Sequence, residues 1–409
     1  MKSNTKGITL VALVITIVIL IILATVTVNN VFGDNGLIRQ AEESRIYQEN
    51  AILADSELIE GASDYIDNIL DKKDNNTQEY KQKETIDSIK VLDETHKFYY
   101  MEYTADYKYD EFLFAGGART QEEVNEFVSN NLLNGQKINF TTDDNVFCTT
   151  FSGRNTKGQT IFGRNLDIIN DTPVLIVKTI PTNTDYKSIS TVHLGMFLDF
   201  QNGIQDNTTE EMEKQLLMSP YVPMDGMNEK GVTIAILALN YKFEELNTEK
   251  NDLTIFSAMR LVLDKAANVD EAINLLKQYD MSFEDVSINA HYQIADAEGN
   301  SAVIEWIDGE LNVIRAENNF QVCTNFYLSP LMSDDDKTSG TAKQRYNTAY
   351  TAIESVNGVF EESQAMELLQ AVSQGNATKW SVVYNSGNLT ADIAPYTQYD
   401  EKDRIKVNI

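Results

Sequence analysis

Cys148 and the polar residues that follow it carry the strongest chemical signal in the sequence. The cysteine lies inside Phe147-Cys148-Thr149-Thr150-Phe151, and Arg164 and Asp167 follow in Phe162-Gly163-Arg164-Asn165-Leu166-Asp167. A thiol with an ordinary pKa of about 8.5 needs a base or a positive charge to become the reactive thiolate near neutral pH. An α-amine, with a pKa of about 7.7 to 8.0, is a suitable base. Cleavage between Phe147 and Cys148 would therefore place nucleophile and base on one residue.

Arg164 and Asp167 carry opposite charges and lie three residues apart. In an irregular extended turn, both side chains could reach the new amine, with Arg164 holding the thiolate and Asp167 the ammonium group. The alternative is an ordinary ion pair at the surface. Cys148 taken alone would equally fit a buried structural cysteine, which is the common state of a free thiol.

Other residue types that could bind metals or transfer protons form weaker patterns. The chain has two cysteines, Cys148 and Cys323, whose spacing indicates neither a disulfide framework nor a cysteine-rich metal site. Its histidines, His96, His193 and His291, are scattered, without a pair at helical spacing. We therefore expect no metal ion and no cofactor. We also expect Cys323 to be a small buried side chain and not a second nucleophile.

The composition limits the classes of function and partner. The 409 residues include 62 acidic and 33 basic ones, which gives a formal net charge of -29. Such a balance disfavours nucleic acid as a partner, because phosphate contacts require Lys and Arg. An acidic, solvated surface is the simpler interpretation. The length predicts more than one structural unit.

The N-terminal segment predicts a membrane anchor. Ile8 to Val28 is almost unbroken apolar sequence, long enough to cross a hydrocarbon core of about 30 Å as one helix. Lys2 and Lys6 precede it, so the positive-inside rule places the N-terminus in the cytoplasm and the rest outside. This predicts a single-pass protein of the cell membrane with an extracytoplasmic catalytic domain. A cleaved secretory signal is the competing interpretation.

The same segment resembles type IV prepilins through Lys6-Gly7-Ile8-Thr9-Leu10-Val11-Ala12. The resemblance implies a prepilin peptidase that cuts after Gly7. Ile8 and Ala12 stand where that family usually has Phe and Glu. We assign residues 1–33 to this leader and transmembrane helix, and residues 34–84 to a stalk helix followed by a polar linker.

Strand and helix patterns recur from residue 85 onward. Thr120 and Glu123 form a capping-box signature at the start of a helix. Alternation and apolar runs predict the remaining elements. The expected strands are 86–91, 98–103, 148–152, 160–164, 174–180, 232–239, 292–295, 302–306, 381–384 and 389–393. The expected helices after the one at Thr120 are 254–267, 269–279, 342–356 and 363–372. This order suggests sheets packed face to face with helices outside.

These motifs together resemble the linear amide C-N hydrolases, the group of choloylglycine hydrolases and penicillin V acylases. Further marks are Asp225-Gly226-Met227-Asn228-Glu229-Lys230-Gly231, Thr324-Asn325 and Arg345. The resemblance implies an α+β fold of four layers, αββα, known as the N-terminal nucleophile hydrolase sandwich. It also implies a site composed of the residues Cys148, Arg164, Asp167, Asn325 and Arg345.

Within that resemblance, Cys148 corresponds to the nucleophile, and Asn325 to the donor that stabilises the oxyanion. Bile-salt hydrolases carry a second active-site Asn in a Gly-Leu-Asn-Phe run. Ala238 falls at that spacing here, and the nearest asparagine is Asn240, which we take as the candidate substrate or oxyanion residue.

The prediction is a membrane-tethered precursor that cleaves itself between Phe147 and Cys148. Residues 85–147 would be a pro-segment that either leaves or stays docked, and residues 148–409 would form the amidohydrolase domain. Its substrate would be a small acyl amide, and self-cleavage would release the domain if the pro-segment leaves. Two alternatives stay open, namely a pilin-like surface or adhesion protein with an inert hydrolase fold, and an acyltransferase that uses the same acyl-enzyme. The sequence does not indicate an oligomeric state.

Overall fold

The structure is a computed structural model. It describes residues 15–20, 78–142, 146–181, 183, 185–239, 248–284, 289–332 and 340–409. Its contacts divide the chain into two units, Met1–Thr77 and Gln78–Ile409. The second unit contains both sheets and every site residue discussed below.

In the first unit, residues 15–20 form a helical segment. The rest of the membrane helix predicted for Ile8 to Val28 lies outside the described residues, as do the stalk predicted for Leu37 to Leu70 and the linker up to Thr77. Within the described part of the chain, no helix has both the length and the apolar character needed to cross a membrane.

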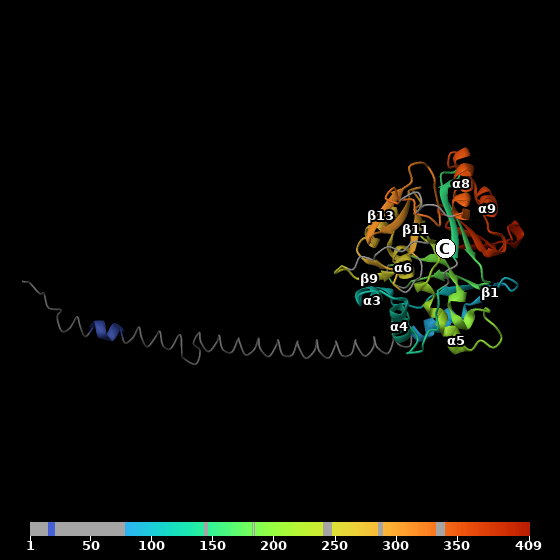
Figure 1. The fold of residues 1–409 in the computed structure, drawn as a ribbon. Coiled ribbons are helices and arrows are strands. Elements are labelled where there is room, and N and C mark those ends of the chain that lie inside the picture. Colours follow the sequence, from blue (N-terminus) through green and yellow to red (C-terminus); the bar gives the residue numbers. More distant parts are fainter. Residues whose placement is uncertain are drawn as a thin grey trace, which may run out of the picture. The chain divides into compact units, whose positions relative to one another are not determined.

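Two large sheets form the centre of the second unit (Figure 1). The nine-stranded sheet has the order β1 (Lys90–Asp93), β2 (Phe98–Tyr103), β5 (Val174–Thr179), β6 (Ser188–His193), β7 (Asp225–Asn228), β8 (Thr233–Leu239), β11 (Asn289–Ala295), β12 (Ser301–Ile307) and β13 (Glu310–Arg315). The six-stranded sheet has the order β14 (Gln321–Thr324), β3 (Val146–Arg154), β4 (Thr160–Ile168), β15 (Thr378–Asn385), β16 (Thr390–Pro395) and β17 (Ile405–Asn408). A parallel pair, β9 (Asp252–Thr254) and β10 (Asp280–Ser282), stands apart from both.

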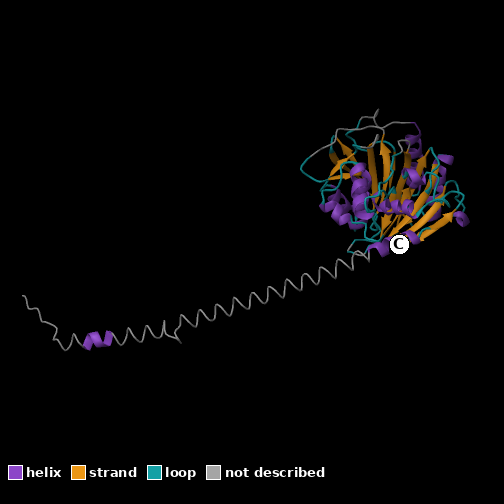
Figure 2. Cartoon of the chain, turned by 90° about the horizontal axis from the view of Figure 1, so that it is seen from below, coloured by secondary structure: helices purple, strands orange, loops and turns teal. Residues whose placement is uncertain are grey.

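Helices cover the outer faces of the sheets (Figure 2). In the space between the sheets, β3 faces β8 and β11. Against the nine-stranded sheet lie α6 (Ile255–Lys265) and α7 (Val269–Leu276). Against the six-stranded sheet lie α8 (Gly340–Ser355) and α9 (Glu362–Ala371). The expected α+β fold with four layers, αββα, is therefore confirmed for the second unit.

Side-chain alternation along β3 shows why the layers hold together. Successive residues of a strand point to opposite faces. Cys148 belongs to the apolar core that includes the space between the sheets, whereas Phe151 belongs to a second core shared with α8 and α9. A strand buried on both sides needs apolar or fully paired side chains at every position, and from Cys148 to Gly153 every residue of β3 is buried.

The segment that precedes Cys148 is part of the same unit. It contains β1, β2 and the helices α3 (Tyr109–Phe114) and α4 (Gln121–Leu132). Thr120 and Glu123 form the expected capping box at the start of α4. The strand predicted for Ile86 to Val91 is misplaced, since residues 78–87 are helical and β1 begins at Lys90. Because β2 pairs with β5, this segment extends the nine-stranded sheet.

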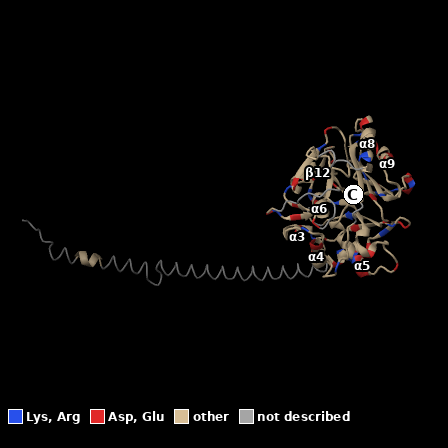
Figure 3. Cartoon of the chain, viewed as in Figure 1, with Lys and Arg blue, Asp and Glu red and all other residues tan. Residues whose placement is uncertain are grey.

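Lys and Arg are interspersed with Asp and Glu over the second unit (Figure 3). Many of these charges pair locally, as Lys83 does with Asp87 at 3.2 Å and Lys406 with Glu401 at 2.8 Å. Such exposed pairs contribute little to stability, because water screens them. This part of the chain therefore depends for its stability on the buried sheet faces.

Candidate active site

Cys148 lies near the start of β3, at the face turned toward the other sheet. It pairs with Leu166 of β4, and its side chain is 0% exposed. Burial raises the pKa of the Cys148 thiol, because a thiolate loses its hydration there. Arg164, through its charge and a hydrogen bond to the sulfur, opposes that rise. The charge of Asp167 adds to the rise, and Arg345 opposes it to a smaller extent.

Arg164 shares the Cys148 face, since it pairs with Thr150 in the β3–β4 ladder, two residues from Cys148. Its Nε donates to Asp225 Oδ2 at 2.5 Å, and its Nη1 donates to the carbonyl of Asn165 at 2.7 Å. Arg164 and Asp225 are both fully buried. A buried cation held by a carboxylate and backbone carbonyls keeps a fixed position, so Arg164 is well placed to stabilise negative charge on the sulfur.

Asp225 is itself held by two further side chains. Trp380 Nε1 donates to its Oδ2 at 2.9 Å, and the Tyr384 hydroxyl donates to its Oδ1 at 2.5 Å. The sequence analysis gave no role to Asp225, which opens the Asp-Gly-Met-Asn run. The structure makes it the carboxylate that fixes Arg164. Asp225 begins a buried strand, and a buried carboxylate requires a partner. This was the available signal for its role.

Asp167 lies on the opposite face of β4 from Arg164. The expectation of an irregular turn is wrong, because residues 160–168 form the strand β4 and three positions along a strand reverse the face. Asp167 Oδ1 accepts from Thr378 at 2.5 Å, and Oδ2 accepts from Gln374 at 2.9 Å. Burial raises the pKa of this carboxyl group, and both hydrogen bonds oppose that rise.

Asn325 joins the end of β14 to Cys148. Its Oδ1 accepts from the backbone N–H of Cys148 at 2.7 Å, and its Nδ2 donates to the carbonyl of Ala238 at 2.8 Å. The side-chain amide is therefore oriented at both ends. Ala238 takes part through its backbone, while Asn240 lies outside the described residues.

Arg345 approaches the same point from α8. Its Nη1 donates to the carbonyl of Cys148 and, at 2.6 Å, to the hydroxyl of Thr149. Its Nη2 donates to Asn325 Oδ1 at 2.9 Å. A weaker contact of 4.0 Å joins it to Asp167 Oδ2. Burial lowers the pKa of Arg345, and the neighbouring carboxylate and sulfur charges oppose that change.

The predicted site residues that the structure describes thus come together around the Phe147–Cys148 bond. Phe147 pairs with Asp167, one position before Cys148 pairs with Leu166. Sequence reasoning missed the neighbours that orient them, which are Thr149, Asp225, Gln374 and Thr378 and the carbonyl of Ala238. These residues are distant in sequence. They meet only because the six-stranded sheet, which carries Thr149 and Thr378, packs against the nine-stranded sheet, which carries Asp225 and Ala238.

Cys323 is the second buried thiol, and it is free, as Cys148 is. It pairs with Thr150, so it faces the same way as Cys148 from the neighbouring strand. Burial raises its pKa well above the ordinary value, and the charge of Glu305 adds to the rise. Its sulfur lies 3.4 Å from His291 Nε2.

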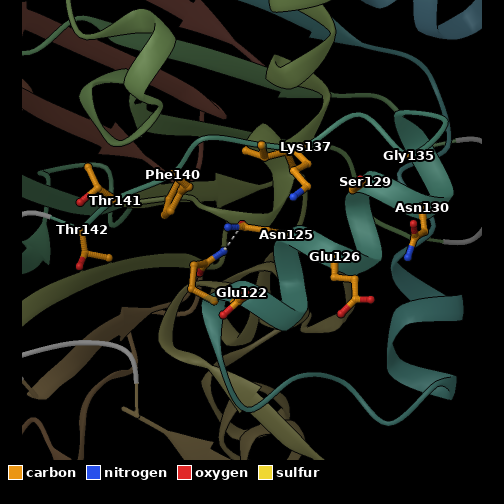
Figure 4. Close-up of a pocket in the computed structure, with 12 residues that line it drawn as sticks. Glu122, Asn125, Glu126, Ser129, Asn130, Gly135, Lys137, Phe140, Thr141 and Thr142 are labelled. Atoms are coloured by element: carbon orange, nitrogen blue, oxygen red, sulfur yellow. Dashed lines mark hydrogen bonds between the residues drawn. The ribbon is translucent and has the colours of Figure 1, made fainter.

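A pocket of about 800 Å³ lies between α4 and residues 135–142 (Figure 4). Its lining is polar, and Gln121 donates to Asn125 at 3.1 Å within it. Cys148 does not line this pocket. The chemistry described above therefore belongs to the buried strand ends and not to this surface cavity.

Taken together, the arrangement places a thiol beside a fixed cation and an oriented amide. A sulfur nucleophile needs positive charge to become a thiolate, and acyl transfer needs a donor for the oxyanion. Arg164 meets the first need, and Asn325 has the donor group for the second. This combination fits nucleophilic acyl transfer.

Comparison with known proteins agrees with this assignment. Residues 148–328 match a model of the family described as linear amide C-N hydrolases, choloylglycine hydrolase family. This region of the chain is thus similar to a family of amide hydrolases, and the matched region begins at Cys148.

A penicillin V acylase from Pectobacterium atrosepticum is 34% identical over 111 residues, which are 25% of this chain and 29% of that protein. The chain thus spans less than a third of the length of this curated relative. The comparisons do not support the prepilin-like resemblance of the N-terminal segment.

Two solved structures resemble the chain at lower identity. Penicillin V acylase from Agrobacterium tumefaciens is 18% identical with a TM-score of 0.45, covering 61% of this chain and 83% of its own. A mutant of the conjugated bile acid hydrolase from Clostridium perfringens is 16% identical with a TM-score of 0.46, covering 64% and 92%.

Proposed function

We propose that the protein is a cysteine amidohydrolase that acts on linear amides after cleavage of its own Phe147–Cys148 bond. The observation that carries the proposal is the convergence of Arg164, Asn325 and Arg345 on Cys148. A purely structural cysteine does not require two buried guanidinium groups and an oriented amide around it. The family match that begins at the same residue supports the same conclusion.

The cleavage step uses the thiol of Cys148 and the carbonyl carbon of Phe147. The sulfur attacks that carbon, the C–S bond forms, the C–N bond breaks, and the Cys148 nitrogen takes up the proton lost by the thiol. Water then hydrolyses the thioester, which leaves a Phe147 carboxylate and a free Cys148 with an α-amine. Asn325 Oδ1, which accepts from this nitrogen in the uncut chain, stays its partner.

Turnover repeats the same chemistry on an external amide. The α-amine takes the thiol proton, the thiolate attacks the substrate carbonyl, and the departing amine receives the proton. An N–H of Asn325 Nδ2 stabilises the oxyanion, a role worth about 3 kcal/mol in well-studied enzymes. Water then releases the acid from Cys148. Asp167, near the cleaved bond, balances the ammonium form of the amine.

The segment before Cys148 stays docked after cleavage in this proposal. Phe98, Met101 and Tyr103 are 0% exposed, and β2 pairs with β5 along its whole length. Tyr103 and Tyr107 donate to Leu217 O at 2.8 Å and to Asp264 Oδ1 at 2.7 Å across the cut. Full burial of one large apolar side chain contributes about 1.5 to 3 kcal/mol, so several hold the fragments together.

Mass and N-terminal analysis of the purified full chain tests the proposal. We expect two fragments, one of which begins at Cys148, that elute together in native buffer and separate in denaturant. Cys148→Ala should give one uncut chain without amidase activity. An active protein with no N-terminus at Cys148 would contradict the shared nucleophile and base.

The substrate class requires a direct assay. Hydrolysis of conjugated bile salts, penicillin V, acyl-homoserine lactones and simple fatty amides should identify the acyl group and the leaving amine. New amides formed on addition of amine acceptors would indicate an acyltransferase, and a protein unable to use any amide would indicate an inert fold.

The apolar stretch from Ile8 to Val28 supports the further proposal that the protein is anchored in the cell membrane. The full chain should then sediment with membranes and resist extraction by salt, while a variant without residues 1–33 should not. Equal recovery of both in the soluble fraction would reject the anchor.

A further inference from the structure

One face of β11 carries polar side chains that cross the space between the sheets. Asn289, His291 and Gln293 alternate along the strand, and all three are buried. Asn289 donates to the hydroxyl of Tyr327 at 3.0 Å, and Gln293 contacts Thr150 at 2.6 Å. Buried polar groups are costly unless paired, so the contact between Gln293 and Thr150 holds β11 against β3 of the other sheet.

His291 contacts the residue just before Asn325. Its Nε2 lies 2.9 Å from the carbonyl oxygen of Thr324. A carbonyl can only accept, so Nε2 must carry a proton and donate it. The same carbonyl accepts from the backbone N–H of Phe326 at 2.9 Å. Asn325 is therefore the central residue of a three-residue turn whose closing oxygen is held by His291.

Glu305 holds the chain on the other side of Asn325. Its Oε1 accepts from the backbone N–H of Leu328 at 2.7 Å, and its Oε2 accepts from that of Ser329 at 3.0 Å. The same Oε1 lies 3.2 Å from His291 Nδ1, and neither side chain is exposed. His291 and Glu305 thus form one buried unit that holds the backbone before and after Asn325.

We propose that the His291–Glu305 pair is the positioning device for the oxyanion donor of the acyl-transfer site. The inference rests on the function proposed above, in which Asn325 acts on the substrate oxyanion. The pair contacts neither the sulfur of Cys148 nor its amine, so it acts through Asn325. A displacement of about 1 Å at a reacting centre reduces the rate by about 100-fold, which sets the expected effect of losing the Thr324 contact.

Two substitutions of His291 separate its two nitrogens. In His291→Gln, the amide nitrogen reaches the place of Nε2 and still donates to Thr324 O. In His291→Asn, the shorter amide reaches only the place of Nδ1, so the contact with Thr324 is lost. We expect His291→Asn to lower kcat about 100-fold with KM nearly unchanged, because the oxyanion forms after binding. His291→Gln should recover most of that loss.

Gln293→Met is the matched control. Gln293 lies on the same strand and face as His291 and is equally buried, but its hydrogen bonds go to β3, β12 and β14 away from the Asn325 turn. We expect this variant to lose thermal stability and to keep its kcat. If both variants lower kcat in proportion to their loss of stability, the role of His291 is structural and the proposal is overturned.

A second measurement uses the thiol of Cys148 directly. Alkylation by iodoacetamide forms no oxyanion, whereas acylation by a p-nitrophenyl ester does. His291→Asn should therefore slow acylation about 100-fold and leave alkylation unchanged. Equal rates of acylation in His291→Asn and the parent protein would overturn the positioning role. A Cys148→Ala protein that still turns over amides would instead overturn the proposed function, so the two failures are distinguishable.

Discussion

The two cysteines have the same burial, but only Cys148 has arginine side chains that lower its pKa. Cys148 and Cys323 lie on the neighbouring strands β3 and β14, face the same side, and are both 0% exposed. Burial raises the pKa of each thiol. Near Cys148, Arg164 opposes the rise in pKa more strongly than the carboxylate of Asp167 adds to it, and Arg345 also opposes it, whereas near Cys323 the carboxylate of Glu305 adds to the rise. Neighbouring charge, and not exposure, therefore distinguishes the proposed nucleophile from the structural thiol.

The hydrogen bonds around the two residues differ in the same way. The backbone of Cys148 is held at its nitrogen by Asn325 and at its carbonyl by Arg345. The sulfur of Cys323 contacts the imidazole of His291, which is already engaged with Thr324 O and Glu305. The contacts of Cys148 orient the proposed nucleophile, whereas the sulfur of Cys323 packs beside the His291–Glu305 pair.

Removal of the Cys148 sulfur should have the largest effect. Cys148→Ala eliminates the proposed nucleophile, so we expect amide hydrolysis to fall by a factor on the order of 10⁴ or more and self-cleavage to stop. Initial rates with an acyl amide and electrophoresis of the purified chain measure both. Residual cleavage above background would show that another residue attacks the bond.

Loss of the charge of Arg164 should have the next largest effect, and it should act on stability as well as on rate. Arg164→Met leaves Asp225 buried without its cation, a change that typically costs about 3 to 5 kcal/mol of folding free energy. The double variant Arg164→Met, Asp225→Asn removes both charges and should regain most of the stability without regaining activity. Denaturant unfolding and kcat separate the two effects. Restored activity in the double variant would show that the cation is not needed by the thiol.

Titration of the two thiols compares them directly. NMR of cysteine-labelled protein, with Cys323→Ala to isolate Cys148 and Cys148→Ala to isolate Cys323, should show Cys148 ionising at the lower pH in the uncut chain. Both pKa values should exceed that of an unfolded thiol, because burial raises each. The folded state then binds these protons more tightly. Their contribution to stability is thus complete below the ordinary thiol pKa and is lost as pH rises through the raised values. The reverse order of ionisation would remove the electrostatic distinction.

The sequence predicted those features that depend on local pattern. The capping box of Thr120 and Glu123, the strand through Cys148, and the helix that carries Arg345 were all recognisable from spacing and residue type. The resemblance to amide hydrolases added Asn325, which no local pattern would have singled out. It also supplied the four layers.

The remaining features depend on long-range pairing. The faces of Arg164 and Asp167 follow from the continuous ladder between β4 and β3. The role of Asp225 depends on β7 lying opposite Arg164 across the two sheets. His291 was dismissed as a scattered histidine, since its partners Glu305 and Thr324 meet it only when β11, β12 and β14 are assembled.

Substitution of Cys323 should have the smallest effect. Cys323→Ala removes a small buried group, which typically costs about 1 kcal/mol, and it leaves His291 bonded to Thr324 O and Glu305. We therefore expect kcat to stay within about threefold of the parent value while the unfolding midpoint falls slightly. Steady-state kinetics beside thermal unfolding provide the check. A loss of activity comparable with that of Cys148→Ala would mean that the sulfur of Cys323 takes part in the reaction, and the electrostatic difference between the two thiols would then not identify the nucleophile.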